Sequence, residues 1–205
     1  LAPMPEASTP TVGLAVVHLF FRTAPLADRA GIVAALDAAA ERGDQAVVVA
    51  LLGHKADLGV MALSSDQWNL RRLQTDLVAA GLDLVDSYVS LTESSEYAEG
   101  IPEEMKQARL YPQLPPEGKP VFCFYPMSKR REVGANWFQL DFDRRKELMY
   151  EHGASGRKFA GRVLQVITGS TGTDVPPWVT VASDSATIAA SALPSWAHCI
   201  VTWTL

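Results

Sequence analysis

The sequence is poor in cysteine and in positive charge. Its 205 residues include two cysteines, Cys123 and Cys199, which lie far apart and form no C-x-x-C motif. This spacing indicates neither a disulfide framework nor a zinc site, and it favours a reducing compartment. Lys and Arg number 18 against 23 Asp and Glu, for a formal charge of -5. A generic nucleic-acid-binding protein has the opposite balance, although a local basic cluster still suits an anionic small molecule.

Long apolar runs and familiar catalytic motifs are also absent. The first ten residues, LAPMPEASTP, have neither the basic start nor the apolar stretch of a signal peptide. Runs such as 46–52 are far shorter than the roughly 20 residues that a membrane-spanning helix needs. The P-loop, dinucleotide-binding, H-E-x-x-H and G-x-S-x-G motifs do not occur. We therefore expect a cytoplasmic protein with no membrane contact and none of these chemistries.

The first half of the chain carries a regular pattern of strands and helices. Hydrophobic residues make up 48% of the sequence, which is enough for a real core. Residues 1–11 are expected to be flexible, and residues 12–91 to form the N-terminal half. In order, we expect a strand at 12–21, a helix at 28–42, strands at 45–53 and 57–63, a helix from Ser65 or Asp66 to Gly81, and a strand at 82–91. This β-α-β-β-α-β order is the ferredoxin-like unit.

The second half of the chain also has a pattern of strands and helices, but a less regular one. A proline-rich connecting loop is expected at 92–119, followed by a C-terminal half at 120–205. We expect strands at 120–126 and 162–168, a helix at 143–152 ended by Gly153, and further short strands at 137–140 and 178–182. The simplest architecture is an α+β fold of two ferredoxin-like halves whose antiparallel sheets join, as in dimeric α/β barrels.

Two features of the second half are candidates for chemistry. The run YPMSKRR at 125–131 stands where an apolar strand ends. It is either a solvated basic turn or a tyrosine at a cavity mouth beside a cationic cluster, which suits carboxylate binding. His152 follows the predicted helix, and a histidine in a last helical turn is commonly a partner of the helix dipole. A metal ligand is the other interpretation of His152, and the residues alone leave both questions open.

Several segments carry a more specific resemblance. YPMSKRR (125–131), NWF (136–138) and ELMYEHGASGRKFAGRVLQVITGS (147–170) resemble the chlorite-dismutase-like haem proteins, and within them the actinobacterial coproheme decarboxylases. GHKADLGVMAL (53–63), WNLRRLQTDLVAAGL (68–82), SYVSLTE (87–93) and ARLYP (108–112) fit the same group. The fold of that family, paired ferredoxin-like halves assembled as a homopentamer, agrees with the element order above.

The resemblance implies an enzyme of haem biosynthesis, also called a hydrogen-peroxide-dependent haem synthase. Its substrate and redox cofactor is Fe-coproporphyrin III (coproheme). Two propionate groups of coproheme lose their carboxyls as carbon dioxide and become vinyl groups, which gives haem b, and hydrogen peroxide is the oxidant. The implied partners are coproheme, peroxide, further copies of the chain in a pentamer, and an upstream ferrochelatase.

The same resemblance assigns roles to single residues. His152 matches the proximal iron ligand, Tyr125 matches the tyrosine that becomes a radical, and Lys129 matches a lysine that holds or protonates near a propionate. The remaining cofactor-binding residues that the match implies are Met127, Ser128, Arg109, Tyr97 and Gln165. Of these, Gln165 is expected over the distal face of the iron, and Arg109 and Tyr97 at propionates.

The sequence departs from the family after residue 174. Pro176 and Pro177 interrupt an expected strand, and the serine- and alanine-rich stretch 183–195 makes a poor amphipathic helix. We therefore expect an atypical end to the C-terminal half, and an altered reading frame is one hypothesis for it. This end supports an alternative function, a non-catalytic porphyrin-binding protein or an inactive relative. Two further alternatives are chlorite dismutation, against which YPMSK speaks, and a cofactor-free stress-responsive barrel.

Overall fold

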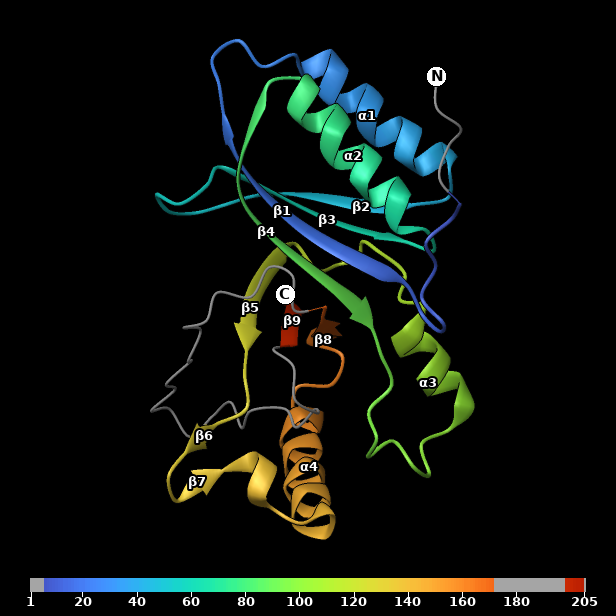
Figure 1. The fold of residues 1–205 in the computed structure, drawn as a ribbon, viewed down its shortest axis with the longest axis vertical. Helices are drawn as coiled ribbons and strands as arrows, with labels where there is room; N and C mark the ends of the chain where they lie inside the picture. Colours follow the sequence, from blue (N-terminus) through green and yellow to red (C-terminus); the bar gives the residue numbers. More distant parts are fainter. Residues whose placement is uncertain (1–5, 172–197, 205) are drawn as a thin grey trace. The chain divides into compact units, whose positions relative to one another are not determined.

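The protein divides into two compact units. The computed structural model describes residues 6–171 and 198–204 of the chain. Unit 1 comprises Leu1–Thr92 with Gln113–Pro115, and unit 2 comprises Glu93–Pro112 with Pro116–Leu205. Figure 1 shows the elements of both units along the chain, coloured from blue to red.

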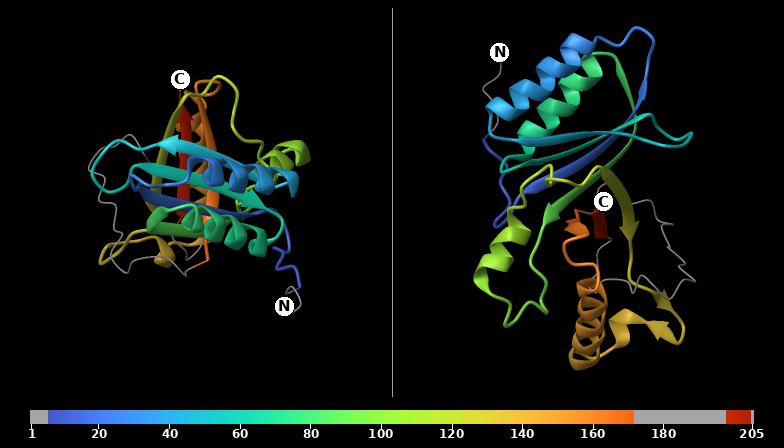
Figure 2. Two further views of the ribbon diagram at one scale, coloured as in Figure 1. Left: turned by 90° about the horizontal axis from the view of Figure 1, so that it is seen from above. Right: turned by 180° about the vertical axis from the view of Figure 1, so that it is seen from behind.

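Unit 1 has the predicted β-α-β-β-α-β order. Its elements are β1 (Ala15–Thr23), α1 (Arg29–Glu41), β2 (Gln45–Ala50), β3 (Leu58–Ser64), α2 (Gln67–Ala79) and β4 (Leu82–Thr92). The strands lie in the order β2-β3-β1-β4, and each neighbouring pair is antiparallel. Both helices cover one face of this sheet, as Figure 2 shows. The ferredoxin-like prediction for this half is confirmed.

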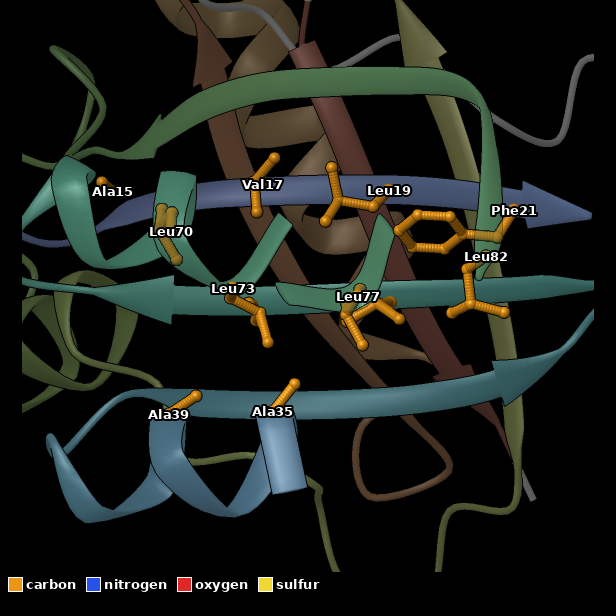
Figure 3. Packing of buried hydrophobic residues seen from close by; sticks show 12 residues of the cluster. Ala15, Val17, Leu19, Phe21, Ala35, Ala39, Leu70, Leu73, Leu77 and Leu82 are labelled. Atoms are coloured by element: carbon orange, nitrogen blue, oxygen red, sulfur yellow. The ribbon is translucent and has the colours of Figure 1, made fainter. Parts of the chain in front are cut away.

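The core of unit 1 lies between this sheet and its two helices (Figure 3). Side chains alternate along a strand, so every second residue of β1 points towards the helices. The principal core residues are Ala15, Val17, Leu19, Phe21, Ala35, Ala39, Leu70, Leu73, Leu77 and Leu82. Burying each large apolar side chain contributes about 1.5–3 kcal/mol to the stability of the folded state. Because these buried residues all belong to unit 1, this unit has a hydrophobic core of its own.

Helix α2 begins at a cap that also anchors the N-terminal segment. The Asp66 carboxylate accepts the backbone N–H of Trp68 at 3.0 Å, so of the two expected caps, Ser65 and Asp66, it is Asp66 that caps the helix. The same carboxylate accepts the Ser8 N–H at 3.0 Å, and Gln67 N donates to the Ser8 carbonyl at 2.9 Å. The flexible start predicted for residues 1–11 therefore contains an anchored residue, Ser8.

Unit 2 is built around three antiparallel strands. Its elements are α3 (Glu103–Leu110), β5 (Val121–Met127), β6 (Arg131–Glu132), β7 (Ala135–Asn136), a 3-10 turn (Trp137–Gln139), α4 (Phe142–Arg157), β8 (Val163–Ser170) and β9 (His198–Thr204). Strand β9 lies between β8 and β5 and is antiparallel to both, and β6 and β7 form a separate hairpin. The α+β class with antiparallel strands is confirmed.

Two expectations for the loops and short strands of unit 2 were wrong. The connecting loop predicted at 92–119 contains α3, whose start has two acidic residues and whose last turn has Arg109, a normal helix pattern. The strand expected at 137–140 is a 3-10 turn, because the Asn136 side chain caps it by accepting Phe138 N at 3.0 Å. The strand expected at 178–182 lies outside the described residues.

A third correction concerns α4, which was expected to end at Gly153. It continues to Arg157 and includes both Gly153 and Gly156. A glycine in a helix interior costs about 1 kcal/mol relative to alanine, which weakens the helix without breaking it. The Asp141 carboxylate caps the other end by accepting Arg144 N at 2.8 Å. His152 consequently lies inside the helix, more than a turn before its last residue.

Candidate functional site

Strand β5 ends at the group of residues that the sequence singled out. Tyr125, Pro126 and Met127 are its last three residues, and Lys129 follows in the turn to β6. Proline within a strand is normally confined to an edge, because it has no N–H for the ladder. β5 is the last strand in the described order β8-β9-β5, which accommodates Pro126. The chain can therefore carry a proline next to Tyr125 and leave the sheet after Met127 without breaking a central ladder.

The strand register places three predicted residues on one face of the sheet. Tyr125 and Ile167 are both opposite Ile200 of β9, and Gln165 is opposite Thr202. Directly opposed residues of antiparallel strands point to the same face, and so do residues two apart. Tyr125, Met127 and Gln165 therefore share one face, which we call the Tyr125 face. Because neighbouring strands are about 4.8 Å apart, β5 and β8 are separated by roughly 10 Å across β9.

The Tyr125 face is open at one end and closed at the other. Val121 is 50% exposed, and Cys123 and Gln165 are also exposed. At the other end of the strands, Met127 is 7% exposed. Tyr125 itself is half-buried at the boundary between the two parts. This arrangement leaves surface beside the phenol for a ligand.

Lys129 has an unusual environment for a lysine. Its side chain is 6% exposed, and its ammonium nitrogen Nζ has no hydrogen-bond partner among the described residues. Nζ lies 4.6 Å from the centre of the Trp137 ring, which the hydrogen bond from Trp137 N to the Arg130 carbonyl holds beside the turn. Burial lowers the pKa of Lys129 to about 7. A buried amine of this kind favours an anionic partner, which would restore its charge.

One of the two arginines after Lys129 also lies on an aromatic ring. The Arg131 guanidinium lies 4.5 Å from the centre of the Phe138 ring. Such cation–π contacts hold a cationic side chain in one orientation. Trp137 and Phe138 are thus functional candidates that the sequence analysis did not name individually. Their only sequence signal was the segment NWF, two residues of which support the cations of the turn before it.

His152 lies on the half-buried side of helix α4. His152 is half-buried, as are Arg145, Leu148 and Met149 on the same side of the helix, and α4 has no fully buried residue. The dipole effect falls off within the last turn of a helix, and that turn holds Arg157. Because His152 lies further inside, the interpretation as a dipole partner loses its basis.

The remaining candidates lie on other elements of unit 2. Tyr97 is 4% exposed, and its ring stacks on Phe142 of α4 with centroids 5.3 Å apart. Burial, with a smaller effect of the Glu96 carboxylate, raises the pKa of Tyr97 to about 12. Arg109 is exposed in the last turn of α3, and Ser128 is exposed after β5. Tyr97 is therefore associated with α4, whereas Arg109 belongs to a separate helix.

A family comparison matches most of the chain. The model of the family described as chlorite dismutase matches residues 26–188. The chain belongs to the chlorite dismutase family. The matched range includes β5, the basic turn after it and α4, so the candidate site residues described above lie within the part of the chain that the family model matches.

Solved structures of related proteins have the same fold. A haem-binding protein from Thermus thermophilus is 28% identical with a TM-score of 0.71, and the match covers 97% of this chain and 80% of that one. A variant of chlorite dismutase from Candidatus Nitrospira defluvii is 16% identical with a TM-score of 0.64, covering 95% of this chain and 78% of that one. The same enzyme in complex with imidazole gives the same identity, TM-score and coverage. These matches confirm the ferredoxin-like α+β fold.

Proposed function

We propose that this member of the chlorite dismutase family is a coproheme decarboxylase. The burial of Lys129 is the observation that carries the proposal. Its ammonium has no hydrogen-bond partner among the described residues, so an anionic ligand group beside it would be favourable. The turn that holds Lys129 begins after Met127, two residues beyond Tyr125 on β5. A carboxylate on the ligand, next to a phenol, is what oxidative decarboxylation of a porphyrin propionate requires. Coproheme has four such carboxylates.

The described residues fit an iron porphyrin. No three His, Cys, Asp or Glu side chains in the described part of the chain gather closely enough to hold a metal ion. In an iron porphyrin the macrocycle itself holds the iron, and a His152 imidazole would add the bond from the protein. Gly156 lies one turn beyond His152, and a Cβ built there meets no described atom within 4 Å. The helix thus leaves open space at Gly156, close to the side that carries His152, which suits a flat ligand.

The haem-binding relative supports the same ligand class. The protein from Thermus thermophilus is described as binding haem and is 28% identical to this chain. We infer that this chain also binds a porphyrin. Haem b would be its product, and coproheme its substrate.

Each residue of the site has a defined task in this proposal. Bound iron porphyrin with hydrogen peroxide supplies the oxidising equivalents. Tyr125 loses its phenolic hydrogen atom and recovers one from the propionate side chain. Lys129 binds or protonates near a propionate carboxylate, with Met127 and Ser128 beside it at the end of β5. Arg109 and Tyr97 are proposed as further propionate contacts, and Gln165 as the polar residue on the distal side.

The overall chemistry balances for each propionate. The group –CH2–CH2–COO⁻ becomes –CH=CH2 with release of carbon dioxide, one proton and two electrons. One hydrogen peroxide takes up two electrons and two protons and becomes two waters. Two decarboxylations therefore consume two peroxides, and the net result is haem b. We further propose a homopentamer that receives coproheme from a ferrochelatase.

Chlorite dismutation and simple porphyrin carriage are the competing functions within the same fold. The three differ in what the coproheme-loaded protein does with an oxidant. A decarboxylase removes porphyrin carboxyls on addition of peroxide, a dismutase releases oxygen from chlorite, and a carrier does neither. We expect carboxyl loss with peroxide and no oxygen from chlorite. Oxygen release with an unchanged porphyrin would overturn the proposal. Among the described helices, none is long and apolar enough to cross a membrane.

A further inference from the structure

The loop at residues 96–99 contacts the start of α4 at three points. The Glu96 carboxylate lies 3.5 Å from an Arg145 guanidinium nitrogen. The Tyr97 ring stacks on Phe142 at 5.3 Å and 24°. The Glu99 carboxylate lies 3.5 Å from Lys146 Nζ. Two acidic residues and a tyrosine of one short loop thus meet two cations and an aromatic ring on the first two turns of the helix.

These three contacts differ in strength. The Tyr97–Phe142 stack is the strongest, because Tyr97 is 4% exposed and an aromatic pair adds about 0.5–1.5 kcal/mol beyond its buried area. The Glu96–Arg145 pair is partly buried, and the Arg145 guanidinium also lies 5.9 Å from the Phe142 ring centre. The Glu99 side chain is 81% exposed, so its pair with Lys146 contributes little. Phe142 and Arg145 are therefore the two effective anchors of the helix.

In the described part of the chain, α4 packs through half-buried rather than fully buried side chains. None of its 16 residues is fully buried, and Phe142 and Tyr150 are 41% and 53% exposed. The half-buried side, with Leu148 and Met149, packs less firmly than a buried core, so contacts at the start of the helix add to what sets its rotation about its own axis. Two such contacts lie about one turn apart, at positions 142 and 145. The 96–99 loop supplies both of them.

Of the two anchors, Arg145 lies on the same side of α4 as His152. An α-helix has 3.6 residues per turn, so the seven residues from Arg145 to His152 make almost two full turns. His152 therefore projects from nearly the same side of the helix as Arg145, about 10 Å further along the axis. A rotation of α4 at Arg145 would redirect the His152 imidazole by the same angle.

We propose that the 96–99 loop aims His152, with Phe142 and Arg145 as its positioning residues. Neither residue contacts the ligand in this account; each acts through the helix. The inference rests on the proposed binding of an iron porphyrin at His152. It assigns to the loop after β4 the task of holding the imidazole where the iron of the substrate can reach it.

The test exchanges the charges of the Glu96–Arg145 pair. Arg145→Glu places two carboxylates together and should turn the helix away, whereas Glu96→Arg with Arg145→Glu restores the pair in reverse. Arg144→Glu is the matched control, because Arg144 is on the same helix, is exposed, and pairs with Glu147 of α4 itself. In the ligand-free protein, we expect the ring NMR signals of His152 to shift in Arg145→Glu, to return in the double variant, and to stay unchanged in Arg144→Glu.

Coproheme binding gives the second measurement. Residues that orient a metal ligand typically alter affinity about 10–100-fold. We expect Arg145→Glu to weaken coproheme binding about tenfold and to change the absorption bands of the iron, with recovery in the double variant. Phe142→Leu is the milder second variant if Arg145→Glu does not fold. Its expected effects on the spectrum and the His152 signals have the same direction.

The outcomes separate this inference from the proposed function. Unchanged His152 signals and affinity in Arg145→Glu, or no recovery in the double variant, would overturn the positioning role. If the unaltered protein took up no coproheme, the proposed function would fail. The ring signals of the ligand-free protein would still decide whether the loop orients His152.

Discussion

The Lys129 ammonium lies 4.6 Å from the centre of the Trp137 ring, and no described residue accepts a hydrogen bond from it. A lysine with 6% exposure and no carboxylate partner in the described part of the chain is unfavourable for the folded protein. The aromatic face recovers part of the loss, since a desolvated cation–π contact contributes about 2 kcal/mol. The rest of the desolvation penalty stays in the ligand-free protein, and an anionic ligand group beside the ammonium would relieve it.

Lys129→Met is expected to stabilise the ligand-free protein. In the unfolded chain Lys129 has its ordinary pKa of 10.5, and in the folded protein its pKa is about 7. The folded state therefore binds this proton less tightly, so the lysine is most destabilising below pH 7, and its cost disappears as the pH rises towards 10.5. We expect Lys129→Met to raise the free energy of unfolding by about 1–3 kcal/mol at pH 6. The gain should shrink at pH 10. Urea unfolding of both proteins at these two pH values measures it.

Lys146→Met is the matched control for that experiment. Lys146 is 28% exposed in its side chain and is paired with Glu99, so its loss should bring no gain at either pH. Equal stability of Lys129→Met and the unaltered protein at pH 6 would contradict the burial of a poorly satisfied cation.

The same lysine predicts how coproheme binding depends on pH. A propionate beside Lys129 favours the charged amine, so binding above pH 7 must also take up a proton. Coproheme affinity should therefore fall as the pH rises from 7 to 9 in the unaltered protein. Lys129→Met should show a weaker and flatter profile over that range. Parallel profiles for the two proteins would remove Lys129 from the binding site.

His152→Ala should impair iron coordination without unfolding the protein. His152 is half-buried on a helix that has no buried residues, so its truncation removes little packing. Affinity for coproheme should fall at least about tenfold, since even residues that merely orient a ligand have effects of that size. The absorption bands of the bound iron should change as well. His54→Ala, in the turn between β2 and β3, is the control and should leave both unchanged. A His152→Ala spectrum identical to that of the unaltered protein would assign the iron ligand elsewhere.

Two glycines of unit 2 should respond to alanine in opposite directions. A Cβ at Gly169 of β8 would overlap the Glu93 carboxylate, whose burial also raises the pKa of Glu93. Gly169→Ala should therefore destabilise the protein by about 1 kcal/mol, the low end for overpacking, because the overlapping atoms are the end of a flexible side chain that can shift. Gly156→Ala in α4 meets open space and should stabilise the helix by up to about 1 kcal/mol. Thermal unfolding compares the two variants. A loss of stability in Gly156→Ala would show that the space at Gly156 is occupied in the ligand-free protein.

The sequence predicted the elements of unit 1 well because their signals are local. Hydrophobic spacing predicted α1 and α2, and Gly43 and Gly81 follow them with the positive φ angles of 85° and 91° that end helices. The same local rules predicted the wrong end for α4, because Gly153 and Gly156 lie within this helix instead of ending it. Strand β9 was not predicted, although its residues HCIVTWT are rich in β-branched types.

The candidate site was only partly visible in the sequence, because tertiary placement determines it. The resemblance singled out Tyr125, Lys129 and His152, and neither their assigned roles nor their joint action is established by the fold. What spacing alone could not give is the shared face of Tyr125 and Gln165, which depends on the register of β5 and β8 with β9. The stacking of Tyr97 on Phe142 likewise joins residues 45 positions apart in the sequence, a contact that no local pattern reveals.

The central claim is best tested by the mass of the porphyrin after peroxide is titrated into the coproheme-loaded protein. Three proteins are compared: the unaltered chain, Tyr125→Phe, and Tyr150→Phe as a control whose tyrosine is 53% exposed on α4. The account predicts loss of two carboxyl groups in the unaltered chain and in Tyr150→Phe. In Tyr125→Phe it predicts normal coproheme binding and an unchanged porphyrin mass. A porphyrin that binds to the unaltered chain and keeps all four carboxyls would contradict the decarboxylase, and normal product from Tyr125→Phe would contradict the role of Tyr125.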